Sequence, residues 1–181
     1  MTLPHNNGDV QIFYPQLTGF KDSDFEKNVN DYLYSYAVTE ELDKWEQDTL
    51  CLNIDYYIHY ADENYISVEF KGEGNVFGSR LSYVQYGVNL DFDKNPSLRM
   101  EISEIIDLQD AYNAIENEVY EYLGVTEKEK LGYTSEEFTE STKRLLESNS
   151  DSDTFNIFAF DSENVFLFID VRYPYKIKIK K

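Results

Sequence analysis

Cys51 and His59 could form a nucleophilic pair, because a cysteine next to an imidazole base is activated as a thiolate. Both fall in one run of alternating apolar and polar residues, 51–60, which is typical of a β-strand. Eight residues of strand span roughly 26 Å, so the two side chains lie far beyond hydrogen-bond reach. The sequence therefore predicts no nucleophilic catalysis, and His59 is interpreted as a surface or rim residue.

A calcium loop is suggested by Asn149, Asp151 and Asp153, which have the spacing of its first three ligands. The sixth position would be Thr154 instead of glycine, and the twelfth would be Phe160 instead of glutamate. One cysteine and two histidines also give no credible zinc ligand set. We expect no bound metal and no cofactor.

The glycines at 72, 74 and 78 follow a predicted strand, as a phosphate-binding loop would. A strand follows them, however, so no helix N-terminus is available to hold a phosphate, and they are interpreted as a flexible connection. Asp55 and Asp170 are the acids that lie within strongly alternating strands, and such acids commonly face water. No catalytic residue is predicted, and a metal-dependent hydrolase is the weakest alternative.

Three predicted strands surround these positions. A hairpin is predicted from two alternating runs, 50–60 and 65–71, joined by a turn at 61–64. A third strand at 82–92 extends the hairpin to a meander. The side chains expected on one face of the hairpin are Leu52, Ile54, Tyr56, Ile58, Tyr60, Ile66, Val68 and Phe70, with Ser67, Glu69 and Lys71 facing outward.

Helical spacing predicts three helices, at about 24–37, 107–123 and 134–147, the first with Ser23 and Glu26 as a capping box. A second hairpin is predicted over 155–171, and the last strand carries lysines that protect a sheet edge. The fold class is therefore α+β: an antiparallel sheet of two hairpin or meander groups with about three helices on one face. We expect one domain over 1–181, with an N-terminal part to about residue 100 and a C-terminal part from about 101.

The chain carries 35 acidic and 16 basic residues, a formal charge of −19, of which −11 lies in residues 101–153. This charge disfavours nucleic acid and anionic membranes, and it suits a basic protein partner. No apolar run is long enough to cross a bilayer. The N-terminal stretch does not read as a signal peptide, so the protein is either cytosolic or secreted with its leader removed.

Seven segments spread over nearly the whole chain carry a family resemblance: residues 14–17, the helix 25–36, residues 65–68, 86–91 and 102–106, the C-terminal hairpin 155–171, and residues 173–177. Together they resemble the extracellular domain of RsiV-like anti-sigma factors, which is related to a domain found ahead of the catalytic module in some peptidoglycan deacetylases. The chain departs from that pattern at Gly78-Ser79-Arg80, where the family often has a turn with histidine.

The resemblance implies a non-catalytic binding or sensor domain at the bacterial cell envelope, extracellular or on the cell surface, whose ligand is lysozyme or a cell-wall component. The alternative is a cytosolic, acidic protein of the immunity or inhibitor type. Because binding groups favour loops on a rigid scaffold, we expect partner contacts on the connection 72–80, at Asn75, Phe77 and Arg80.

Overall fold

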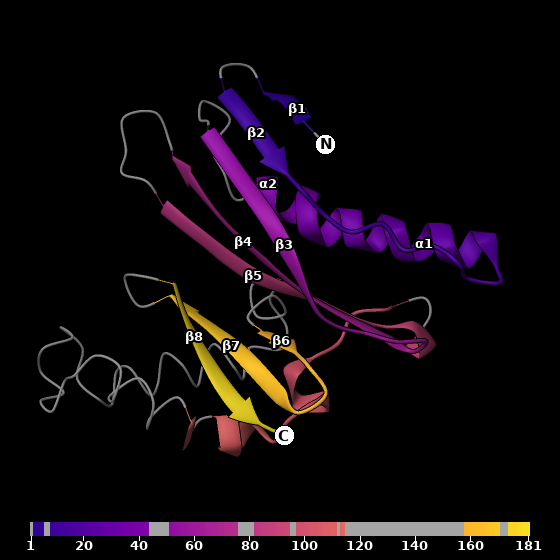
Figure 1. Ribbon diagram of the computed structural model, residues 1–181, viewed down its shortest axis with the longest axis vertical. Helices are drawn as coiled ribbons and strands as arrows, with labels where there is room; N and C mark the ends of the chain where they lie inside the picture. The colour runs from indigo at the N-terminus through magenta and orange to yellow at the C-terminus, as the bar shows by residue number, and fades with distance from the viewer. Residues whose placement is uncertain are drawn as a thin grey trace, which may run out of the picture.

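The computed structural model describes residues 2–5, 8–43, 51–75, 82–94, 97–111, 113–114, 158–170 and 174–181. Within this part the chain forms two sheets (Figure 1). The large sheet has the order β1 (Thr2–His5), β2 (Gly8–Ile12), β3 (Cys51–Ala61), β4 (Tyr65–Asn75) and β5 (Ser82–Asp91). The small sheet has the order β6 (Phe158–Phe160), β7 (Asn164–Asp170) and β8 (Pro174–Lys180).

Strands β3, β4 and β5 form the predicted antiparallel meander. The turn between β3 and β4 is held by Asp62, whose Oδ1 accepts the backbone N–H groups of Asn64 and Tyr65, each at 2.8 Å. Strand β2 departs from the expected all-antiparallel arrangement, because it pairs with β3 in parallel. Antiparallel strands can be joined by a tight turn, whereas the parallel β2–β3 pair is joined by a long connection that contains the first helix.

The helical segment consists of α1 (Ser23–Tyr34), a π-helical turn η1 (Ser35–Thr39) and α2 (Glu40–Asp43). Its N-cap is Asp22 and not Ser23 as predicted, since the Asp22 carboxylate accepts the N–H groups of Asp24 and Phe25. Glu26, the predicted second half of the capping box, instead accepts the N–H groups of Gly19 and Phe20 and so holds the preceding loop.

One face of the large sheet packs against this helical segment. The buried apolar residues there form one cluster: Val10, Ile12, Val29, Leu33, Ala37, Val38, Leu52, Ile54, Ile66, Val68, Phe70, Val84, Tyr86, Val88, Leu90, Phe92 and Leu98. Tyr86 adds a polar contact, because its hydroxyl donates a hydrogen bond of 2.6 Å to the carbonyl of Ala37. The alternation predicted from the sequence is the origin of this apolar face.

The other face of the large sheet carries the small sheet, which contradicts the expectation that Ser67 and Glu69 point outward. Both are buried, and Ser67 is fully so. The Ser67 hydroxyl donates to Asn89 Oδ1 at 2.6 Å and accepts the N–H of Phe160 at 2.8 Å. Asn89 Nδ2 in turn donates to the carbonyl of Phe158 at 2.7 Å. Side chains of β4 and β5 therefore hydrogen-bond with backbone groups of β6, a strand of the other sheet.

Gly87 makes this close packing possible. A Cβ atom at Gly87 would lie 1.7 Å from the carbonyl oxygen of Phe158, far inside any normal contact. Gly72 has a similar role between β3 and β4, since a Cβ there would lie 2.0 Å from the carbonyl oxygen of Asn53. The interpretation of Gly72 and Gly74 as part of a flexible connection is therefore wrong: β4 continues through both to Asn75.

A β-bulge shifts the register of β3 between Ile58 and Tyr60. Before the bulge Ile58 lies opposite Val68, and after it Tyr60 lies opposite Ser67. The extra residue moves Tyr60 to the face of the small sheet, where its ring packs 5.8 Å from that of Phe160. The prediction that Tyr60 shares a face with Leu52 and Ile54 is therefore wrong.

The structure bears out the α+β class but not three helices on one face. Besides the helical segment 23–43, the described part contains short 3₁₀ turns at Phe92–Lys94 and Ile102–Glu104. Residues 108–111 and 113–114 are helical, at the start of the predicted helix 107–123, whose remainder lies outside the described residues. The predicted helix 134–147 also lies outside them. The division into two parts near residue 100 stays a prediction.

Candidate functional site: the cleft and the open face of the large sheet

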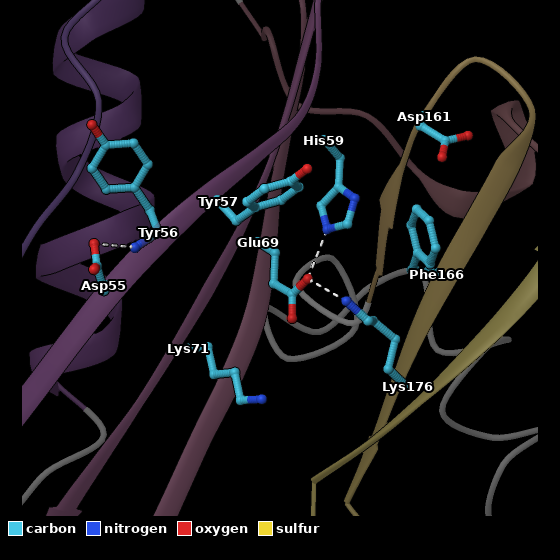
Figure 2. Close-up of a pocket in the computed structure, with 9 residues that line it drawn as sticks. All are labelled: Asp55, Tyr56, Tyr57, His59, Glu69, Lys71, Asp161, Phe166 and Lys176. Carbon is cyan, nitrogen blue, oxygen red and sulfur yellow. Dashed lines mark hydrogen bonds and ion pairs between the residues drawn. The ribbon is translucent and has the colours of Figure 1, made fainter.

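An open cleft of about 620 Å³ lies where the edge of the small sheet meets the large sheet (Figure 2). Strands β3 and β4 provide most of its lining, and β7 and β8 provide the opposite wall. The lining residues are Asp55, Tyr56, Tyr57, His59, Glu69, Lys71, Asp161, Phe166 and Lys176. The cleft therefore depends on contacts between segments about one hundred residues apart.

The Glu69 carboxylate is the centre of the polar contacts in the cleft. Its Oε2 is 2.7 Å from His59 Nε2 and accepts a hydrogen bond of 2.8 Å from Lys176 Nζ (Figure 2). Its Oε1 accepts a hydrogen bond of 2.6 Å from Gln85 Nε2. An ionised carboxylate can only accept hydrogen bonds, so His59 Nε2 carries a proton in this arrangement. The four side chains come from β3, β4, β5 and β8 and join the two sheets.

The environment of Glu69 strongly favours its ionised form. Burial by itself raises the pKa of a carboxyl group, but the hydrogen bonds from His59, Lys176 and Gln85 and the charge of Lys176 outweigh it. The pKa of Glu69 falls from 4.5 to about 2. A carboxylate with such a pKa is a poor general acid or base at neutral pH. Its contacts with His59, Lys176 and Gln85 connect strands of both sheets.

His59 is held between aromatic rings, with its ring centroid 4.8 Å from that of Tyr57 and 4.5 Å from that of Phe166. Its side chain is only 7% exposed, as is that of Glu69. The interpretation of His59 as an ordinary surface or rim residue is therefore wrong. Lys176 Nζ completes the arrangement 5.2 Å from the centroid of the Phe166 ring. The bulge beside His59 and the covering by β7 and β8 together bury it.

Beyond the cleft, the same side of the large sheet is open. We call this surface the open face. It is defined by seven exposed residues, six in β3, β4 and β5 and one directly after β2: Asn53, Asp55, Tyr57, Lys71, Glu73, Tyr83 and Phe13. The strand registers place Asn53 opposite Glu73 and Glu73 opposite Tyr83, and they place Asp55 opposite Lys71. Phe13 continues the β2–β3 ladder, because its N–H donates to the carbonyl of Ile54.

Three large aromatic side chains lie on this open face. Tyr57 is 65% exposed, Tyr83 is 54% exposed and Phe13 is 45% exposed. Single exposed apolar residues are common on protein surfaces, whereas several on one sheet face, together with polar groups, are typical of a binding surface. Sequence reasoning missed this surface because alternation alone does not tell which parts of a sheet face remain uncovered.

Asn75 is the one predicted partner-binding residue that the structure describes. It ends β4 next to the open face, and its Oδ1 accepts a hydrogen bond of 3.4 Å from the N–H of Cys51. Phe77 and Arg80 lie outside the described residues, so their role as contacts stays a prediction. Cys51 is exposed and unbridged at the beginning of β3, and His59 lies near the end of the same strand.

The other sequence candidates give no further site. Asp55 is exposed and lies in the cleft lining, while the Asp170 side chain and the residues 149–153 lie outside the described part. Among the described residues, no group of three or more His, Cys, Asp or Glu side chains is arranged to hold a metal ion. Likewise, no helix in this part is long and apolar enough to cross a membrane. No protein-family model matches the chain, and no curated protein matches it.

Proposed function

We propose that this protein is a non-catalytic binding domain that recognises a basic protein partner. The observation that carries the proposal is the open face, with its exposed Tyr57, Tyr83 and Phe13 beside the acidic side chains Asp55 and Glu73. Tyrosine is enriched at the energetic centres of protein interfaces, because it combines a large apolar ring with a hydrogen-bonding group. The formal charge of −19 favours a basic partner.

The state of Glu69 also supports a binding role over a catalytic one. The pKa of Glu69 is lowered to about 2, and hydrogen bonds from three side chains occupy both of its oxygens. Carboxyl groups that act as general acids or bases commonly have pKa values close to the working pH, whereas the pKa of Glu69 is about 2. The polar cluster is suited to holding the two sheets together behind a binding surface.

For the biological setting, we propose a bacterial envelope-associated sensor or binding domain of the RsiV-like kind, located outside the cell, with lysozyme or a cell-wall ligand as the first candidates. The segments that carry the resemblance include Ser67, Gly87 and Asn89, which pack the small sheet onto the large one. The resemblance therefore supports a shared fold more strongly than a shared ligand. A cytosolic immunity or inhibitor protein remains the alternative, because the same acidic charge suits a basic toxin.

Titration of lysozyme by calorimetry tests the proposal, first at low salt and then near 1 M salt. A protein with a charge of −19 attracts any basic protein at low salt, whereas at 1 M the screening length is about 3 Å. Binding with a defined stoichiometry that survives high salt is the expected result for shaped recognition. Loss of all binding at high salt would contradict the lysozyme assignment and favour a different basic partner.

The predicted contacts are tested in the same titration. Phe77→Ala and Arg80→Ala should each weaken binding by about tenfold if the connection after β4 contributes to the interface. Glu163→Gln is the control, because Glu163 is exposed on the turn between β6 and β7, in the other sheet. Equal affinities in all three variants would remove Phe77 and Arg80 from the site.

A further inference from the structure

The open face has the dimensions of the centre of a protein interface. Tyr57 lies opposite Glu69 on β4, and Tyr83 lies opposite Glu73, four residues farther along the same strand. With about 3.3 Å per residue and about 4.8 Å between strands, the two tyrosines are about 16 Å apart across the sheet. A standard interface buries about 800 Å² on each partner, a patch about 30 Å across. Both tyrosines therefore fit within one such patch.

The charges on the open face favour cationic side chains of a partner. Asp55 and Glu73 are exposed there. Lys71 lies opposite Asp55 and offsets its charge, whereas Glu73 lies opposite the uncharged Asn53 and Tyr83. The nearby charge of Glu69 is already balanced by Lys176 in the cleft. Exposed carboxylates next to exposed tyrosine rings suit arginine, whose planar guanidinium stacks on an aromatic ring while its N–H groups bind a carboxylate.

The protein uses one part of this chemistry within its own fold. The guanidinium carbon of Arg99 lies 4.6 Å from the centroid of the Tyr36 ring. That contact is on the helix side of the molecule, where Tyr36 packs against the apolar cluster. On the open face, Tyr57 and Tyr83 offer such rings to solvent, next to acidic groups.

We infer that the open face is the docking surface for the basic partner, and that arginine side chains of that partner stack on Tyr57 and Tyr83 and pair with Asp55 and Glu73. This inference rests on the proposed function and adds the surface and the chemistry of the contact. The cleft beside Tyr57 extends the surface, because Asp55, Tyr57 and Lys71 belong to both.

Two matched pairs of variants of the full chain test the inference, with lysozyme, ribonuclease A and cytochrome c as basic probes in calorimetry at low and high salt. The aromatic test is the double variant Tyr57→Ser and Tyr83→Ser, with Tyr34→Ser as control. Tyr34 is on α1, on the helix side of the large sheet, where its ring centroid is 5.6 Å from that of Tyr14. We expect a loss of about a hundredfold in affinity for the double variant and a change of less than threefold for the control.

The charge test compares two double variants. One combines Asp55→Asn and Glu73→Gln on the open face, and the control combines Glu63→Gln and Glu163→Gln. Each pair removes two negative charges, but Glu63 and Glu163 are exposed on turns away from the open face. The open-face pair should lose at least tenfold in affinity and show a weaker salt dependence, while the control pair should change less than threefold. A circular dichroism spectrum and an unfolding curve for every variant establish that each one is folded.

The outcomes separate this inference from the proposed function. If a basic probe binds at high salt with the same affinity to wild type and to all variants, the docking surface is overturned and the proposed function stands. Failure of the wild-type protein to bind any of the three probes would overturn the docking surface together with the proposal of a basic protein partner. If a neutral chito-oligosaccharide binds instead, with an affinity that the tyrosine substitutions reduce, the surface recognises a glycan and the basic-protein inference is overturned.

Discussion

The two faces of the large sheet are covered by different means. On the helix side, Val29 and Leu33 of α1 pack on buried aliphatic and aromatic side chains of the strands. On the other side, hydrogen bonds from Ser67 and Asn89 hold β6, and the ion pair between Lys176 and Glu69 holds β8. Tyr60 and Tyr65 add apolar contacts with the buried cluster of the small sheet. Figure 1 shows the helix beside β2–β5 and the small sheet, orange to yellow, below them.

This difference sets how precisely each layer is positioned. Apolar packing tolerates changes in shape as long as volume and pattern are kept, so it allows a range of closely related arrangements. Buried hydrogen bonds are directional, and a partner left without one is costly. The small sheet is therefore fixed in one place relative to β3 and β4, which also fixes the wall of the cleft. Substitutions on the two sides should consequently have different effects.

The largest effect is expected for Gly87→Ala. Its Cβ would lie 1.7 Å from the Phe158 carbonyl oxygen, so β6 must move and its hydrogen bonds to Ser67 and Asn89 are lost. We expect a loss of about 3 kcal/mol in the free energy of unfolding, measured by urea denaturation.

Gly19→Ala is the control for that measurement. Gly19 has a φ of 99° and nothing within 4 Å of the position of a Cβ, so only backbone strain of about 1 kcal/mol is added. Equal losses for Gly87→Ala and Gly19→Ala would show that the contact with β6 is unimportant.

A slightly smaller, pH-dependent effect is expected for Glu69→Gln. Because the pKa of Glu69 in the folded protein is about 2, below its ordinary 4.5, its contribution is fully present above about pH 4.5 and is lost as the pH falls toward 2. That difference in pKa corresponds to about 3 kcal/mol, which solvent screening in the open cleft reduces to about 2.5 kcal/mol. The stability difference between wild type and Glu69→Gln should therefore be large at pH 7 and shrink between pH 4.5 and 2.

Chemical denaturation at a series of pH values measures this difference. Glu63→Gln removes the same charge from an exposed turn and should differ from wild type by less than about 0.5 kcal/mol at pH 7. A difference for Glu69→Gln that stays constant from pH 7 to pH 2 would contradict the assigned role of the carboxylate.

The smallest losses of stability are expected when one hydroxyl group is removed from either face of the large sheet. Ser67→Ala leaves the N–H of Phe160 without its acceptor and removes the donor to Asn89, so we expect a loss of about 2 kcal/mol. Tyr86→Phe removes one hydrogen bond to the Ala37 carbonyl and keeps the ring, so about 1 kcal/mol is expected. Urea denaturation of both variants decides the comparison, and a larger loss for Tyr86→Phe would reverse it.

Local patterns in the sequence predicted the central elements well. The alternation in 50–71 and 82–92 predicted β3, β4 and β5, and helical spacing after Ser23 predicted α1. These elements are encoded by residues close together in the chain, so a short window contains the necessary information. The alternation Lys176-Ile177-Lys178 also predicted β8 as an edge strand, with the isoleucine buried and both lysines exposed.

The site could not be predicted in the same way. Burial of Glu69 depends on Lys176, which lies 107 positions later in the chain, and nothing near Glu69 indicates that partner. The bulge at residues 58–60 has no local signal either, although it decides which face Tyr60 joins. A run of alternating residues cannot show which part of a sheet is covered by a segment from elsewhere.

The wide separation of these contacts along the chain has a consequence for the order of assembly. Strands β3 to β5 are linked by short connections, whereas Phe160 reaches Ser67 across 93 positions and Lys176 reaches Glu69 across 107. Closing such long loops costs entropy before any contact compensates for it, which slows the step. During synthesis the strands that carry Ser67, Glu69 and Asn89 emerge well before the strands that cover them. Until those later strands arrive, Ser67, Glu69 and Asn89 remain hydrated on that side of the nascent sheet.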